Sequence, residues 1–218
     1  MCIRDRCEYL RGRLRTAEHY FRRCIRVLRN IGEQRAYALF MRHFASLLQA
    51  MGRLTESREM MQLCLAAADS ARQLDIAHLA AISRIDHDLE SDPMVDRASI
   101  LRQAQASLRY AVLTDMYRVR MEARRVLAKM RFQDGDFDGA LEHAADAAAI
   151  AARFGFSLRK INLRILMGQI LQRRGDPISG RAMVDEGGRI ADRVGYQRAV
   201  EEAHHVQLAV RRRSPVGH

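Results

Sequence analysis

Turns marked by glycine recur at intervals of about 40 residues along this chain, and this spacing restricts it to a repetitive fold. The interval from Gly12 to Gly52 equals the interval from Gly135 to Gly175. A second series lies half a period after members of the first: Gly32, Gly155 and Gly195. The interval from Gly52 to Gly135 equals two periods plus three positions, which predicts one more turn at Glu90–Pro93. The chain is therefore predicted to consist of helices of about 15 to 20 residues joined by short turns.

The residues at these turns favour helix ends. Glycine adopts the left-handed conformation just past a helix end at little cost, so Gly135 and Gly175 can each close a helix. Asp136 and Asp176 follow them and can cap the next helix, and Pro93 and Pro177 suit a first helical turn. In the second repeat the half-period break is predicted at Gln73–Asp75, about three positions late.

Apolar residues recur between the turns at intervals of three or four, as on one face of a helix. One such run is Leu14, Ala17, Phe21, Cys24, Ile25 and Leu28. The same offsets recur after Gly52 at Leu54, Ser57, Met61, Cys64 and Leu65, and after Gly135 at Phe137, Ala140, Ala144, Ala147 and Ala148. Strong helix formers dominate, with only 3 prolines, and the alternation typical of strands is missing. These features predict an all-α fold of antiparallel helix–turn–helix repeats that stack to share one core.

The repeated pattern, G-x-[LF]-x-x-[AS]-x(3)-[FMA]-x-x-[CA]-[ILA], resembles the tetratricopeptide repeat in a longer variant of about 40 residues. The resemblance covers roughly residues 7 to 212 and implies an α-solenoid that winds as a right-handed superhelix. We expect a single domain over 1–218, with repeats at 1–32, 33–74, 75–114, 115–155 and 156–195 and a C-terminal capping helix at 196–212. Repeat 3 departs by placing Arg97 where a small residue belongs. Repeat 5 departs at three glycines that are expected to loosen its second helix: Gly180, Gly187 and Gly188.

The same resemblance implies a protein–protein interaction or scaffold module, of the kind found in larger bacterial signalling and transcription regulators. In that family the first helix of each repeat lines a concave face that holds the ligand. The residues that match are Arg42, Ser46, Gln49, Arg125, Lys129, Phe132, Asn162, Gln169 and Arg173. This set is basic, and arginine binds carboxylates through two parallel hydrogen bonds. The expected ligand is therefore an acidic peptide, a chain's C-terminal carboxylate or a partner domain.

Nucleic-acid binding is the alternative function, because the formal net charge is +11. Against it, repeat modules that read single strands need stacking aromatic residues, and aromatic residues are only 6% of this chain. Catalysis is not expected, because the chain carries none of the phosphate-loop, nucleophile-elbow or zinc-protease motifs. The neighbours His87 and Asp88, and the pair His204 and His205, point in different directions on a helix. We therefore expect neither a metal nor another cofactor.

The remaining expectations concern location and the chain ends. Four cysteines without a C-x-x-C pair suit a reducing cytoplasm, and no apolar run is long enough for a bilayer, so no membrane partner is expected. The opening segment Met1–Arg6 resembles a non-native end, which suggests that N-terminal repeats are missing. An uncapped terminal helix exposes its apolar face, so self-association through the solenoid ends is a further expectation.

Overall fold

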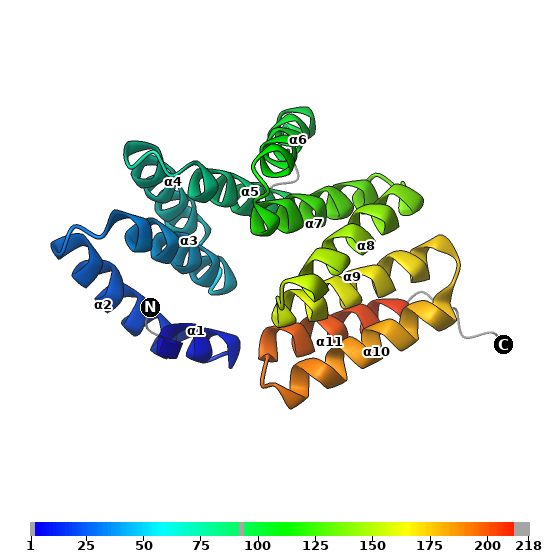
Figure 1. The fold of residues 1–218 in the computed structure, drawn as a ribbon. Helices are drawn as coiled ribbons and strands as arrows, with labels where there is room; N and C mark the ends of the chain where they lie inside the picture. The colour runs from blue at the N-terminus through cyan, green and yellow to red at the C-terminus, as the bar shows by residue number, and fades with distance from the viewer. Residues whose placement is uncertain (1–2, 92–93, 212–218) are drawn as a thin grey trace. The chain divides into compact units, whose positions relative to one another are not determined.

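The computed structural model describes residues 3–91 and 94–211, and these residues fold into eleven helices without a strand. In order along the chain (Figure 1) they are α1 Ile3–Leu10, α2 Leu14–Asn30, α3 Gln34–Ala50, α4 Leu54–Ser70, α5 Leu74–Ser91, α6 Arg97–Leu113, α7 Tyr117–Gln133, α8 Phe137–Arg153, α9 Ser157–Arg174, α10 Pro177–Arg193 and α11 Gln197–Arg211. The all-α fold is confirmed, and the helices from α2 to α11 have the predicted lengths. Sequential packing of antiparallel helices is typical of a helical-repeat solenoid.

The predicted turn chemistry is also confirmed. All seven glycines of the two series adopt positive φ, from +68° at Gly195 to +112° at Gly175. Asp136 and Asp176 cap the next helices by accepting hydrogen bonds of 3.0 Å from the backbone N–H of Gly139 and Ser179. Pro177 is the first residue of α10. The turns therefore follow from the local residues, as expected from the sequence.

Two turns lack glycine, and one of them departs from its predicted position. The turn between α4 and α5 covers residues 71–73 and not Gln73–Asp75, because Arg72 adopts a left-handed φ of +53° where the series would place glycine. The N–H of Gln73 still donates to the carbonyl of Ala68 at 2.8 Å, as after the glycine turns. Asp115 holds the corresponding place between α6 and α7, at φ +57°.

The interval from Gly52 to Gly135 exceeds two repeat periods by three positions, and these three positions lie before α6. The interval from the start of α5 to the start of α6 is three positions longer than the interval from the start of α3 to the start of α4. Asp96 caps α6 by accepting a hydrogen bond from the N–H of Ser99, so Arg97 is the first helical residue. Ile100, and not Arg97, occupies the buried position that Ser57 holds in α4. The expectation that Arg97 takes the place of a small packing residue is therefore wrong, by three positions. The predicted turn residues Asp92 and Pro93 lie outside the described residues.

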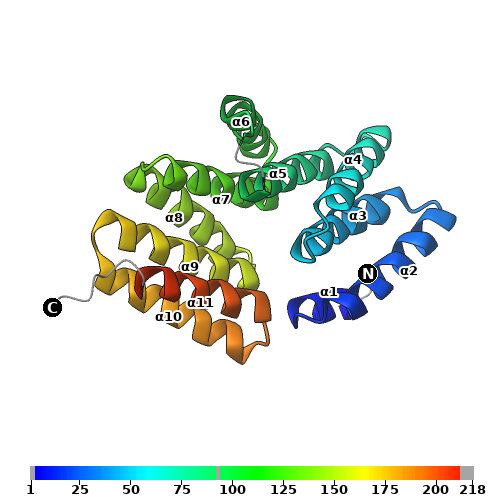
Figure 2. The ribbon, with the colours of Figure 1, turned by 180° about the vertical axis from the view of Figure 1, so that it is seen from behind.

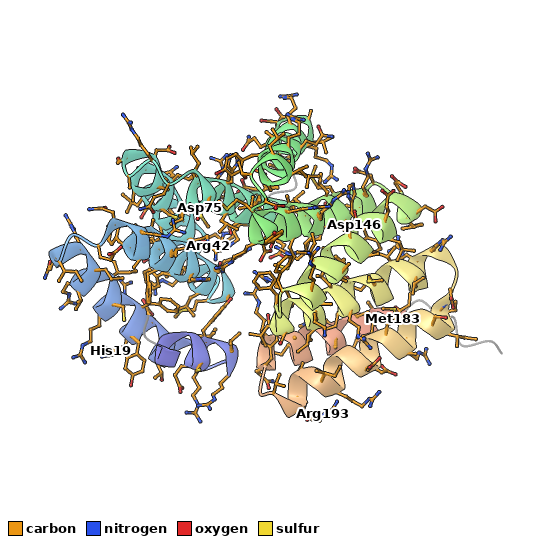
Figure 3. All side chains as sticks on the ribbon, in the orientation of Figure 1. His19, Arg42, Asp75, Asp146, Met183 and Arg193 are labelled. Carbon is orange, nitrogen blue, oxygen red and sulfur yellow. The ribbon has the colours of Figure 1, made fainter. Side chains whose placement is uncertain are left out.

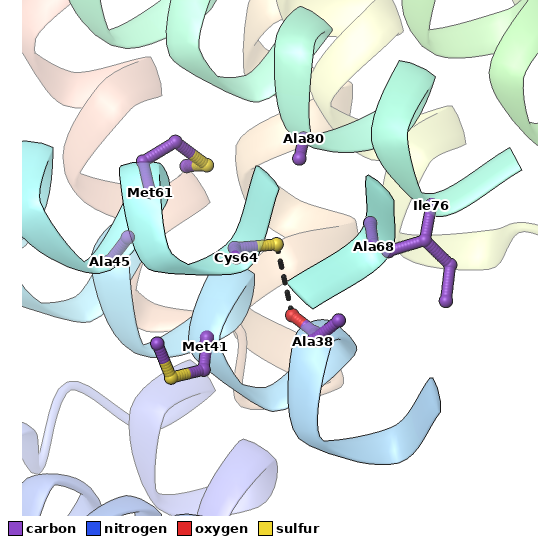
Figure 4. Close-up of a cluster of buried hydrophobic side chains, with 8 residues drawn as sticks. All are labelled: Ala38, Met41, Ala45, Met61, Cys64, Ala68, Ile76 and Ala80. Atoms are coloured by element: carbon purple, nitrogen blue, oxygen red, sulfur yellow. Dashed lines mark hydrogen bonds between the residues drawn. The ribbon is translucent and has the colours of Figure 1, made fainter. Parts of the chain in front are cut away.

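The chain divides into two compact units, Met1–Val126 and Leu127–His218. In the first unit each helix from α1 to α6 packs on the next, and α3 also packs on α5, as Figures 1 and 2 show for α2 to α5. The core joins α3, α4 and α5 through small and flexible side chains (Figure 4): Ala38, Met41, Ala45, Met61, Cys64, Ala68, Ile76 and Ala80. Small residues let neighbouring backbones approach, and the methionines fill the remaining space.

In the second unit α8, α9, α10 and α11 pack in sequence, and α9 also packs on α11. Gly168 of α9 and Gly180 of α10 meet so closely that a Cβ on Gly168 would lie 2.7 Å from the carbonyl oxygen of Gly180. The expectation that Gly180, Gly187 and Gly188 loosen the second helix of this repeat is wrong. The helix α10 is continuous. Gly180 and Gly187 lack a side chain, which lets α10 approach α9 closely, and both glycines are buried at this contact.

Among the described residues, no helix is both long and apolar enough to cross a bilayer. Cys64 is buried as expected, and Cys7 and Cys24 are half-buried free thiols. A helix is observed in the segment 196–212 as α11, which begins one position later than expected, and residue 212 lies outside the described part. Its capping role stays a prediction.

Candidate functional site

Equivalent residues of consecutive repeats contact one another where α3 and α5 pack side by side. The contacts join residues 40 or 41 positions apart, and we call them the α3–α5 ladder: Arg35 with Asp75 (2.6 Å), Arg42 with Ser83 (3.1 Å), Ser46 with His87 (3.5 Å) and Gln49 with Glu90 (3.1 Å). The repeat period brings equivalent positions to the same height on neighbouring helices. The predicted residues Arg42, Ser46 and Gln49 therefore all face the next repeat.

Arg42, which Figure 3 labels, belongs to this ladder. It is buried, with 3% of its surface exposed. Its Nη1 donates to the hydroxyl of Ser83, and its Nη2 lies 3.2 Å from Nε2 of His43. Ser46 is half-buried and donates to the carbonyl of Arg42 at 3.3 Å. The side chain of Arg42 thus joins two repeats, and a contact of Arg42 with a ligand stays a prediction.

Arg125 of α7 is likewise buried, with 7% of its surface exposed, and it lies between two carboxylates. Its two terminal nitrogens donate to Asp86 of α5 at 3.2 and 2.6 Å, and its Nε donates to Glu122 at 3.0 Å. Burial by itself lowers the pKa of Arg125, but the attraction of Asp86 and Glu122 outweighs burial and raises the pKa above its usual value. The charge that the sequence assigned to a ligand is therefore balanced inside the protein.

His87 is a buried residue for which the sequence predicted no role. Its Nδ1 lies 3.3 Å from the hydroxyl of Ser57 on α4, and its Nε2 contacts Ser46 on α3. Ser57 in turn donates to the carbonyl of Ala45 at 2.8 Å. His87 therefore links three helices. A signal for this contact was present, because Ser46 and His87 are separated by one repeat length.

Two of the predicted residues in the second unit also pack internally. Phe132 of α7 is half-buried against Phe137 of α8, with ring centroids 6.0 Å apart. Asn162 of α9 accepts a hydrogen bond from the hydroxyl of Tyr196 at 3.1 Å and donates to Glu202 of α11 at 3.4 Å. Asn162 and Glu202 are again one period apart, so the second unit has its own contact between consecutive first helices.

The other three predicted residues of the second unit are at least partly exposed. Arg173 is exposed near the end of α9, and Lys129 and Gln169 are half-exposed. Ala128 of α7 shares a core with Leu166 and Ile170 of α9, which brings these two helices together. Gln169 lies one repeat length after Lys129, and Arg173 lies one turn further along the same helix. These three predicted residues of the second unit are therefore not buried.

The chain matches no family model and no curated protein sequence. The helical-repeat architecture therefore rests on the regular array of antiparallel helices of about 17 residues and on its repeat period. Among the described residues, no three histidine, cysteine, aspartate or glutamate side chains gather as metal ligands would.

Proposed function

We propose that this chain is a protein-interaction module of tetratricopeptide-like repeats, with a binding rather than a catalytic role. Contacts between consecutive first helices carry the proposal, since α3 packs on α5, α9 packs on α11, and α7 shares a core with α9. Within each unit, such packing lines up equivalent positions of successive repeats into a surface for an extended partner. By the same resemblance we propose that the module serves a larger bacterial regulator.

The surface formed by Lys129, Gln169 and Arg173 favours an acidic ligand. Arg173 offers a planar, permanently charged group that can hold a carboxylate by two hydrogen bonds, and Lys129 adds a second cation. Arg42 and Arg125 are buried, and Arg125 is already neutralised by acidic neighbours. We therefore propose that an acidic segment, or the C-terminal carboxylate of a partner, binds in the second unit at these three residues.

Fluorescence polarisation with labelled peptides tests this proposal. An acidic peptide with a free C-terminus is compared with its amidated form and with a form whose acidic residues are replaced by amides. The double variant Lys129→Gln, Arg173→Gln should weaken binding of the acidic peptide at least tenfold. Arg181→Gln with Arg193→Gln is the matched control, because it removes the same charge from exposed positions of α10 and should change affinity less than twofold. Equal losses in both variants, or no binding by the wild-type chain, would contradict the proposal.

A further inference from the structure

The outer face of α2 is a surface of arginines on the first unit. The inner face of α2 buries Ala17 and Phe21 against α3. With 3.6 residues per turn, the residues opposite this buried side include four exposed arginines: Arg15, Arg23, Arg26 and Arg29. We call them the α2 arginine face. His19, which is exposed between them, points away from α3 in Figure 3.

The charges of this face are not balanced within the described part of the chain, where these four arginines take part in no ion pair or hydrogen bond. The single acidic residue of α2, Glu18, is held by two other arginines: it accepts from Arg22 at 2.8 Å and from Arg53 at 2.6 Å. Burial tends to raise the pKa of Glu18, but these two arginines outweigh it and lower the pKa below its usual value. Glu18 is thus engaged at the side facing α4, and the four arginines keep their full charge toward solvent.

We propose that the α2 arginine face binds the phosphate backbone of a double-stranded nucleic acid. Arg15 and Arg29 lie almost four helical turns apart, which is about 21 Å along a helix at about 1.5 Å per residue. A duplex presents about one negative charge per 1.7 Å of its axis, so phosphates of either strand come within reach of each arginine. The guanidinium group matches phosphate geometry and forms bidentate hydrogen bonds with it.

The composition of this surface favours a nucleic acid over a protein partner. Protein interfaces are built around buried apolar or aromatic residues, whereas nucleic-acid interfaces are polar and strongly positive. Val27, half exposed, is the large apolar residue that α2 offers beside the arginines. A duplex is favoured over a single strand because single strands are held by bases stacked on aromatic rings. The ring of His19 meets Tyr20 edge-on, at 5.7 Å between centroids, and gives no flat platform for a base.

Binding of a short fluorescent DNA duplex of mixed sequence to the full chain, measured at a series of salt concentrations, tests the proposal. Four phosphate contacts predict that the logarithm of the binding constant falls with the logarithm of salt concentration at a slope of about −3.6. The variant Arg15→Gln, Arg23→Gln, Arg26→Gln, Arg29→Gln should lose most of this slope and at least tenfold in affinity. Circular dichroism should show an unchanged fold, because all four side chains are exposed.

The matched control removes the same four charges from exposed positions of α6 and α10: Arg102→Gln, Arg109→Gln, Arg181→Gln and Arg193→Gln. This control should keep the wild-type slope and bind within threefold of wild type. Equal losses in the two variants would overturn the proposal, since net charge and not the α2 arginine face would then explain binding. It would also be overturned if the same four arginines bound single strands, an acidic peptide or anionic vesicles more tightly than the duplex. The charge reversal Arg23→Glu with Arg26→Glu should abolish duplex binding if the proposal holds.

Discussion

Replacing Arg125 by alanine should strongly destabilise the first unit. The substitution removes a buried guanidinium that donates to Asp86 at 2.6 Å and to Glu122 at 3.0 Å. The side chain of Glu122 is only 5% exposed and that of Asp86 is 19% exposed, so water cannot replace these hydrogen bonds well. The carboxylates of Asp86 and Glu122, which pair with Arg125 in the wild-type chain, would be left near each other in a medium of low polarity.

Removing one partner of a buried ion pair typically costs about 3 to 5 kcal/mol, because the remaining charge stays buried and uncompensated. For a chain of this size, each kcal/mol lowers the melting temperature by roughly 2 to 4 °C. We therefore expect Arg125→Ala to melt roughly 6 to 20 °C below the wild-type chain. Thermal and urea unfolding followed by far-ultraviolet circular dichroism measures this loss.

Two further variants test whether the loss of stability comes from the buried ion pairs of Arg125 and not from the removal of any arginine on α7. Arg131 on the same helix pairs with Asp136 at 3.1 Å, but both side chains are more than 40% exposed. Arg131→Ala should therefore cost less than about 1 kcal/mol. Arg125→Lys keeps the charge but loses the forked geometry, and its stability should fall between those of the wild type and Arg125→Ala. If Arg125→Ala were as mild as Arg131→Ala, the carboxylates would not depend on Arg125 and our reasoning would be refuted.

Three other predictions concern helix packing, turns and a thiol. Gly168→Ala should destabilise the second unit by about 1 to 3 kcal/mol in urea unfolding, because the new methyl group would clash with the backbone carbonyl of Gly180. Arg72→Gly should stabilise the first unit by up to about 1 kcal/mol in the same assay, since Arg72 holds a left-handed φ of +53° that favours glycine. Burial raises the pKa of Cys64 to about 11, so the folded chain should hold about 100-fold less Cys64 thiolate below pH 9 than the unfolded chain. The raised pKa also means that this thiol favours folding below its unfolded pKa and that stability falls as the pH rises toward 11. Alkylation by iodoacetamide at pH 8, read by mass spectrometry, should therefore reach Cys64 only after unfolding.

Each of these predictions has a result that would contradict it. A Gly168→Ala variant as stable as wild type would show that α9 and α10 can separate at no cost. Unchanged stability of Arg72→Gly would mean that its left-handed backbone carries no strain. Alkylation of Cys64 in the folded chain at the rate of Cys7 would show that burial does not protect the thiol.

Local chemistry explains how far the sequence predicted the fold. Glycine after a helix, aspartate before the next and apolar residues every three or four positions act over a short stretch of chain, so they predicted the helices and most turns. Prediction was wrong at the turn before α5, which covers residues 71–73, because Arg72 adopts there the left-handed conformation that glycine adopts at the other turns. It failed again before α6, where an inserted segment shifted Arg97 by three positions.

For the candidate site, the sequence identified the first helices and their basic residues, but it did not tell which charges remain available. That depends on which side chains meet across repeats, such as Arg42 with Ser83 and Arg125 with Asp86. These partners lie about one repeat length apart, and neither residue type reveals the contact by itself. The sequence by itself determined the repeat, the helices and the excess of positive charge. The tertiary structure alone decided which arginines are buried and neutralised and which, as on α2, stay free, because pairing and burial are properties of packed neighbours and not of single residues.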